Sequence, residues 1–213
     1  SATTYGSVSI DGNVATYIPN ANFNGADNFS FTVSDGFLSS TEDVTLTIIP
    51  INDAPVLSFD SQELLFDEDT SGSIPFTAID VDEDTLTYSI TEGTDIVPVI
   101  VENNITFTAP LNFHGAEIFT VTVSDGALSN SQTISVTVVS VNDAPIATIG
   151  LSATTDEDEP IVITITGSDV DEEPLTFILE SDATNGAIVI TEELENNDNG
   201  TFATYTPNPD YNG

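Results

Sequence analysis

The chain has 213 residues, of which 36 are Asp or Glu and one is His; it contains no Lys and no Arg, so its formal charge is −36 at pH 7. Nucleic acids and anionic membrane surfaces are recognised through cationic side chains, so this composition excludes nucleic acid as a partner and favours bound cations. Hydrophobic residues make up 39% of the chain, which is enough for a packed core and argues against disorder throughout. The chain has no Cys, so neither disulfides nor thiolate metal sites contribute. No apolar run approaches the roughly 18 residues of a membrane span, and we expect no membrane insertion.

Hydrophobic and polar residues alternate along several short segments, which is the period of a β-strand. The segment 28–33, for example, places Phe29, Phe31 and Val33 on one face, and we expect such alternating Phe residues to form the core. Asp-Gly, Asn-Gly and Glu-Gly pairs separate the segments, the acidic run 192–200 predicts a long hairpin loop, and no segment has a helical period. The fold class predicted is therefore all-β, as an antiparallel β-sandwich. In chain order, strands are expected over residues 14–18, 28–33, 44–48, 86–90, 118–123, 134–138 and 201–205.

Short motifs recur along the chain in a fixed order. The string Asn-Asp-Ala-Pro at Asn52–Pro55 returns 90 residues later at Asn142–Pro145. Such spacing identifies a tandem array with a period of about 90 residues. The other recurring strings are Val33–Gly36 with Val123–Gly126, Asn22–Gly25 with Asn112–Gly115 and Asp210–Gly213, Asp67–Asp69 with Asp156–Asp158, and Asp80–Asp82 with Asp169–Asp171.

The period divides the chain into three parts. Residues 1–53 are expected to be the C-terminal part of a repeat, 54–143 a complete repeat, and 144–213 the N-terminal part of a repeat. Half a sandwich exposes unpaired edges, so we expect a section of a longer array. Alternatively, the C-terminal part of one molecule is completed by the N-terminal part of another through strand addition, which makes the chain a self-assembling filament subunit. Against this alternative, both parts carry the hairpin that includes 14–18 and 201–205, which a composite repeat needs only once.

Three acidic strings frame each junction between repeats: Asp67–Asp69, Asp80–Asp84, and a Ser-Asp-Gly turn. Clustered carboxylates repel one another unless a cation lies among them. Ca²⁺ takes six to eight oxygens from carboxylates, amides and carbonyls, whereas Zn²⁺ prefers the His and Cys ligands that are scarce here. An EF-hand loop is excluded, because its sixth position requires Gly, whereas this chain has Thr85 and Pro174 there. The strings therefore predict Ca²⁺ sites.

The order E-x, D-x-D, D-G and N-D-A-P resembles the cadherin repeat, and most of all the bacterial cadherin-like tandem repeats of large secreted surface adhesins. The resemblance covers the whole chain. It implies a Greek-key, cadherin- or Ig-like sandwich in which Ca²⁺ ions between successive repeats stiffen the joint. It also implies an extracellular, cell-surface location, with the neighbouring repeats of the same chain as the main partners.

The resemblance also implies a set of metal ligands. The linker here is shorter than the animal D-x-N-D-N-A-P, and the family's D-R-E string is absent; Asp27 and Glu117 stand near its place and are expected to replace it. Glu157 matches the family's early-strand glutamate in the last repeat. The ligands implied are Asp27, Asn52, Asp53, Asp80, Asp82 and Asp125 at the first junction, Glu68, Glu117, Asn142, Asp143, Asp169 and Asp171 at the second, and Asp35 after the first Phe-rich strand.

The leading functional hypothesis is a calcium-rigidified stalk of an extracellular adhesin or surface fibre. The alternatives are the self-assembling filament subunit and a module that binds a surface polysaccharide or cell; the candidate aromatic platforms are Tyr5, Phe37 and Tyr211. An enzyme is not expected, because no nucleophile–base pair is suggested and the single His114 is replaced by Asn24 and Asn212 in the other copies.

Overall fold

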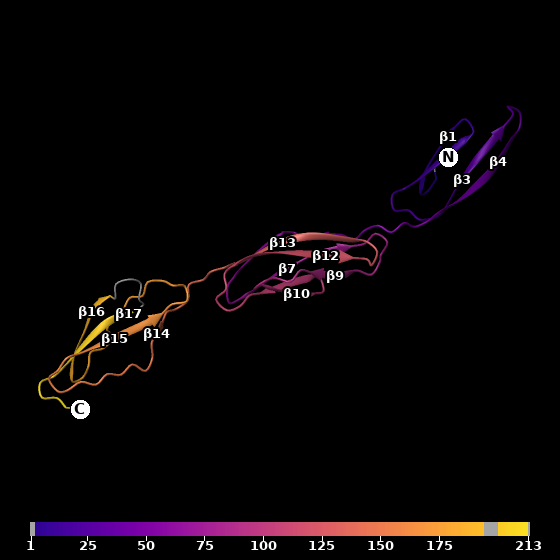
Figure 1. Cartoon of the computed structure of the whole chain (residues 1–213). Coiled ribbons are helices and arrows are strands. Elements are labelled where there is room, and N and C mark those ends of the chain that lie inside the picture. The colour runs from indigo at the N-terminus through magenta and orange to yellow at the C-terminus, as the bar shows by residue number, and fades with distance from the viewer. Residues whose placement is uncertain (1–2, 194–199, 213) are drawn as a thin grey trace. The chain divides into compact units, whose positions relative to one another are not determined.

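The computed structural model describes residues 3–193 and 200–212. Those residues form β-strands, turns and loops without a helix, so none could cross a membrane as a helix. The chain divides into two compact units. Unit 1 contains Ser1–Phe66, Thr70–Pro110 and Gly115–Val138, and unit 2 contains Asp67–Asp69, Leu111–His114 and Val139–Gly213. Figure 1 labels most of their strands.

The middle repeat is a complete sandwich. One sheet has the order β6-β13-β12-β9 and the other β10-β11-β7, with a short β5-β8 pair beside them. All pairs with a printed register are antiparallel. The strands are β5 (Val56–Ser58), β6 (Glu63–Asp67), β7 (Ser71–Pro75), β8 (Thr77–Ile79), β9 (Thr87–Ile90), β10 (Val97–Val101), β11 (Asn104–Thr108), β12 (Gly115–Ser124) and β13 (Ser129–Val139).

The core of this repeat follows from the alternation in sequence. Phe119, Val121 and Val123 share one face of β12, and each is completely buried. Phe107 reaches them from the facing sheet, where its ring centroid lies 5.1 Å from that of Phe119. Because successive strand residues point to opposite sides, the preceding Ile118 is 73% exposed. The expected sandwich core is confirmed here.

The N-terminal part of unit 1 contains two separate hairpins. The strands β1 (Gly6–Asp11) and β2 (Val14–Pro19) pair only with each other, as do β3 (Gly25–Ser34) and β4 (Ser39–Ile48). Phe29 is buried, but Phe31 and Val33 are 38% and 63% exposed. The prediction that Phe31 is a core residue was therefore wrong. The reason is that β3 and β4 have no flanking strands among the described residues, whereas β12 and β13 have β9 and β6.

Unit 2 contains a single sheet with the order β14-β15-β17-β16. The expected hairpin is confirmed by the pairing of β16 with β17. The acidic residues 194–199 of the predicted loop lie outside the described residues. The strands are β14 (Ile146–Ala147), β15 (Ile161–Ser168), β16 (Gly186–Glu193) and β17 (Gly200–Pro207).

Candidate functional site

The loop that follows β8 gathers three carboxylates. Oδ1 of Asp80 accepts the backbone N–H of Asp82 at 2.9 Å and that of Asp84 at 3.4 Å. One carboxylate oxygen from each of these three residues lies within 4.8 Å of the others. Oδ2 of Asp80 is sealed from solvent and has no hydrogen-bond partner. A buried carboxylate oxygen without a donor is unfavourable unless a cation lies beside it.

The linker between the first two repeats reaches this loop. The backbone N–H of Asp53 donates to Oδ2 of Asp82 at 2.8 Å, and Nδ2 of Asn52 donates to Oδ2 of Asp125 at 2.8 Å. Oδ1 of Asp125 accepts the N–H groups of Ala127 and Leu128, both at 2.6 Å. The Asn52 amide and then these turn amides lower the pKa of Asp125, which is therefore held ionised. The structure thus brings together Asn52, Asp53, Asp80, Asp82 and Asp125.

The same arrangement recurs inside unit 2. The backbone N–H of Asp143 donates to Oδ2 of Asp171 at 2.7 Å, and that of Asp171 donates to Oδ1 of Asp169 at 2.9 Å. Nδ2 of Asn142 turns back onto the carbonyl oxygen of Asp143 at 2.9 Å. Asp169 follows β15 directly, as Asp80 follows β8, so the end of a strand positions each D-x-D string.

Glu68 and Asp69 add two carboxylates to this second cluster. Glu68 is only 4% exposed, and its Oε1 accepts the N–H of Val141 in the linker at 2.7 Å. Oδ1 of Asp69 accepts the N–H of Asn112 at 2.8 Å. The sequence analysis did not select Asp69; the available signal was its copy Asp158, whose Oδ1 accepts the N–H of Asp210 in the same way. The turn after β6 therefore belongs to the cluster.

Asp143 lies in a strongly negative environment. Its burial and then the charges of Asp69, Asp171, Glu68 and Asp169 raise its pKa. Its Oδ2 is also sealed from solvent without a hydrogen-bond partner. A carboxylate in this position favours either a proton or a cation.

Asp27 and Glu117 are engaged elsewhere. Oδ2 of Asp27 accepts the hydroxyl of Tyr17 at 2.8 Å, and burial together with this bond raises the pKa of Tyr17 to about 12. Burial acts to raise the pKa of Asp27 too, but hydrogen bonds from Tyr17, Asn28 and Tyr5 outweigh it and lower the pKa. Glu117 accepts the N–H groups of residues 94–96 at 2.9, 2.8 and 3.3 Å. Both carboxylates hold the fold of their own repeat.

Asp35 and Glu157 lie outside the two clusters. Oδ1 of Asp35 accepts the N–H groups of Phe37 and Leu38 at 2.9 and 2.8 Å, which repeats the turn of Asp125. No side chain among the described residues donates a hydrogen bond to Asp35 as the Asn52 amide does to Asp125. Glu157 is exposed in the turn closed by the N–H of Glu159 on the carbonyl oxygen of Asp156.

Replacing Glu117 by Gln is expected to lower stability without changing Ca²⁺ affinity. The amide NH₂ cannot accept a hydrogen bond, so at least one N–H of residues 94–96 loses its partner, at a cost of about 1–3 kcal/mol. Burial acts to raise the pKa of Glu117, but these backbone bonds lower it below 4.5. Its contribution is therefore present above pH 4.5 and is lost as the pH falls through the lower folded-state pKa. Denaturant unfolding at neutral pH and near pH 4 should show the difference between variant and wild type shrinking in acid. Weaker Ca²⁺ binding by the variant would restore Glu117 as a ligand.

Comparisons with known proteins place the chain among Ig-like domains. The family described as bacterial Ig domain matches residues 1–47, 52–137 and 142–213. No curated protein matches the chain in sequence. Solved structures with a similar fold include cadherin domains 1–5 of protocadherin gamma B2, with 18% identity and a TM-score of 0.49 over 98% of this chain and 46% of that one. Drosophila N-cadherin EC1-4 has 13% identity and a TM-score of 0.40 over 96% and 56%.

An endo-fucoidan hydrolase from glycoside hydrolase family 107 is also similar, with 19% identity and a TM-score of 0.35 over 96% of this chain and 33% of that one. The chain thus spans about a third of that hydrolase. At these identities the likeness concerns the fold alone.

Proposed function

Because the chain belongs to the bacterial Ig domain family, in three tandem copies, we propose that it is a non-enzymatic extracellular stalk whose repeat junctions bind Ca²⁺ and are stiffened by it. The repeats are 1–53, 54–143 and 144–213, and they meet at the two Asn-Asp-Ala-Pro strings. The parent protein is a secreted or surface-attached adhesin or fibre, and the neighbouring repeats are the partners of each junction.

The observation that carries this proposal is the pair of sealed carboxylate oxygens, Oδ2 of Asp80 and Oδ2 of Asp143. Each belongs to an acidic cluster in a chain that has no Lys or Arg to neutralise it. No Lys or Arg is therefore available for ion pairing, and a bound cation would compensate both oxygens. All the available donors are oxygens of carboxylates, amides and carbonyls, a set that suits Ca²⁺ better than Zn²⁺.

The residues that hold the ions come from the linker and from the loops beside it. In the first junction, the linker residues Asn52 and Asp53 are already hydrogen-bonded to Asp125 and Asp82. In the second, Glu68 and Asp171 bind the linker backbone at Val141 and Asp143. An ion shared by these groups fixes the linker and removes the repulsion that otherwise drives the loops apart. The proposed ligands are Asn52, Asp53, Asp80, Asp82 and Asp125 at the first junction, and Glu68, Asp69, Asn142, Asp143, Asp169 and Asp171 at the second.

Small-angle scattering of the whole chain tests this mechanism. With about 1 mM Ca²⁺, a concentration suited to extracellular modules, the scattering should report a single extended particle with a defined maximum dimension. With chelator, it should report a flexible chain with a broad distribution of dimensions. Mg²⁺ at the same concentration serves as the control, because it demands a tighter octahedron and should restore less of the order. Identical profiles with Ca²⁺ and with chelator would contradict the stalk mechanism.

Polysaccharide binding has weaker support from the aromatic residues. Tyr5 stacks on Phe23 with a centroid distance of 4.4 Å and an interplanar angle of 3°, so one face of its ring is used inside the repeat. Phe37 is 96% exposed at the tip of the turn after β3. A sugar platform usually presents an aromatic face together with polar partners, and the stacking on Phe23 leaves only one face of the Tyr5 ring for such a contact.

A further inference from the structure

Asparagine followed by glycine is a chemically labile pair. Because glycine has no side chain, its backbone nitrogen can approach the carboxamide of the preceding Asn with little steric hindrance. The chain contains four such pairs, which begin at residues 24, 185, 199 and 212. The structure describes both residues of two of them, Asn24–Gly25 and Asn185–Gly186. Each of these two is followed by Ala, so the tripeptides are identical and a difference in their reactivity has to come from the fold.

The pair in the first repeat is open. Asn24 is exposed, in the irregular segment between β2 and β3. Gly25, the first residue of β3, has a φ of 120°. Apart from its two chain neighbours, a Cβ placed on Gly25 would meet only the ring of Phe23, at 3.9 Å. The Asn24 side chain therefore has room to turn back onto the backbone nitrogen of Gly25.

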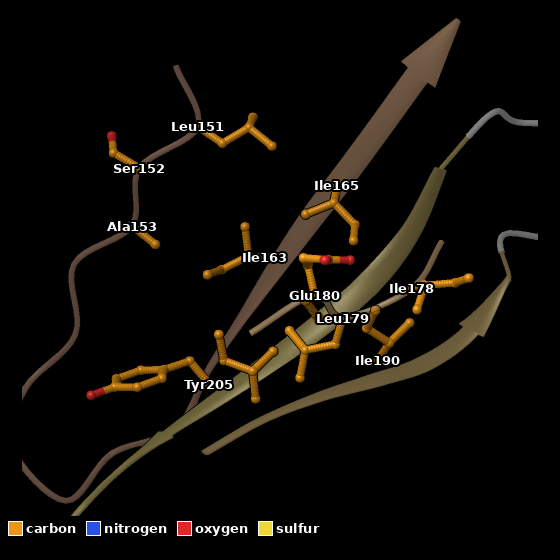
Figure 2. A pocket seen from close by; sticks show the side chains of 12 residues that line it. Leu151, Ser152, Ala153, Ile163, Ile165, Ile178, Leu179, Glu180, Ile190 and Tyr205 are labelled. Atoms are coloured by element: carbon orange, nitrogen blue, oxygen red, sulfur yellow. The ribbon is translucent and has the colours of Figure 1, made fainter. Parts of the chain in front are cut away.

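The pair in unit 2 is closed. The carbonyl oxygen of Asn185, which is only partly exposed, accepts the N–H of Asn208 at 3.0 Å and the hydroxyl of Tyr205 at 2.9 Å. Figure 2 shows the Tyr205 side chain projecting from its strand. A Cβ placed on Gly186 would collide with this ring and with the carbonyl oxygen of Thr206. These contacts hold the backbone of the pair and leave little room for the Asn185 side chain to cyclise.

Asn24 also lines a cavity at the first junction. The cavity has a volume of about 390 Å³, and its lining includes Asn20 and Asn22 from the same turn and Asp53 and Asp82. The backbone N–H of Asp53 donates to Oδ2 of Asp82, and both residues are among the proposed calcium ligands. Asn24 contributes a neutral amide to this cavity. A carboxylate in its place would be a further negative group beside two others.

We propose that Asn24 is a site of spontaneous deamidation that changes the charge of the first junction. The backbone nitrogen of Gly25 attacks Cγ of Asn24, and the side-chain nitrogen leaves as ammonia with the proton that the Gly25 nitrogen loses. Water then opens the cyclic imide at either carbonyl carbon and returns a proton to the Gly25 nitrogen. The new acid ionises, so an aspartate or an isoaspartate carboxylate replaces the amide. Water is the only co-reactant, and nothing is oxidised or reduced.

The second junction does not have this chemistry. His114 and Gly115 occupy there the positions of Asn24 and Gly25, and an imidazole has no amide to lose. The first junction alone therefore gains a carboxylate at this position as the chain ages. The affinity of a Ca²⁺ site rises with the number of its charged ligands, so deamidation tightens Ca²⁺ binding at the first junction. This consequence rests on the proposed function, whereas the deamidation itself does not.

Peptide mapping after incubation tests the deamidation. The whole chain is kept at mildly alkaline pH, where the Gly25 nitrogen loses its proton more readily. It is then cleaved after aromatic residues, since trypsin finds no Lys or Arg. Aspartate and isoaspartate should accumulate several times faster at residue 24 than at residue 185. In denaturant, which is the matched control, the two identical tripeptides should convert at equal rates. A rate at residue 24 no higher than that at residue 185 in the folded chain would overturn the proposal.

Titration calorimetry with Asn24→Asp, which imitates one product, tests the effect on the junction. Both chains compared carry Asp143→Asn, which weakens the second junction. In this background, Asn24→Asp should bind Ca²⁺ severalfold more tightly, and the control Asn185→Asp should leave the affinity unchanged. An unchanged affinity for Asn24→Asp would overturn the effect on the junction. If neither chain binds Ca²⁺, the stalk proposal fails while the mapping result stands, so the two failures are distinguishable.

Discussion

Replacing Asp143 by Asn is expected to stabilise the calcium-free chain and to destabilise the calcium-bound chain. Without an ion, the Asp143 carboxylate is repelled by Asp69, Asp171, Glu68 and Asp169, and burial with these charges raises its pKa. The neutral amide removes that repulsion. With Ca²⁺, the carboxylate becomes a ligand, and its loss should weaken binding at the second junction by about ten- to a hundredfold or more.

The pH dependence of the folding stability of the calcium-free chain should likewise show that the Asp143 carboxylate is destabilising. A carboxyl group whose pKa is higher in the folded state binds its proton more tightly there, so its contribution to stability falls as the pH rises through the unfolded-state pKa toward the folded-state value. In the wild type without Ca²⁺, this group should therefore oppose folding at neutral pH. The Asp143→Asn variant should lose that component of the pH dependence.

Thermal unfolding of the whole chain with Ca²⁺ and with chelator measures both effects, and titration calorimetry gives the affinity. Asp60→Asn is the matched control, because it removes the same charge from an exposed turn outside the clusters. It should shift both melting temperatures slightly and in the same direction. An Asp143→Asn variant that melts lower than the wild type under both conditions would show that Asp143 has an ordinary structural role.

Replacing Phe119 by Ala should cost about 3–5 kcal/mol of the free energy of unfolding of the middle repeat. Its ring is completely buried and packs on Phe107, so the truncation leaves a cavity between the two sheets. The loops that end β6, β8 and β12 carry Glu68, Asp80 and Asp125. Loosening the sandwich that positions them should weaken Ca²⁺ binding at both junctions as well.

Denaturant unfolding measures this loss, with Ile118→Ala as the control. Ile118 is the preceding residue on the same strand but faces outward and is 73% exposed, so its truncation should change stability by about 0.5 kcal/mol or less. Equal losses for Phe119→Ala and Ile118→Ala would mean that the sandwich core is not where the alternation and the structure place it.

The sequence by itself determined the repeats, the strand type and the composition of the junctions. The alternation of Phe119, Val121 and Val123 is a local property of an extended backbone, so it fixes which side chains share a face without knowledge of the partner strands. The strings Asn52–Asp53 and Asp80–Asp82 return after 90 and 89 residues, and the structure brings each linker to its own D-x-D loop. The composition also excludes Lys and Arg as partners of these carboxylates.

Only the tertiary structure shows which groups each carboxylate contacts. Asp27 and Glu117 have the spacing of candidate ligands, yet Tyr17 and the amides of residues 94–96 engage them. Asp69 belongs to a recurring acidic string but was not among the ligands expected from the sequence, and the turn after β6 brings it near Asp143. The burial of Phe31 likewise depends on flanking strands rather than on its own alternation. A strand pattern is set by neighbours one and two residues away, whereas the partner of a carboxylate or an apolar face is set by segments tens of residues distant, which the local pattern does not encode.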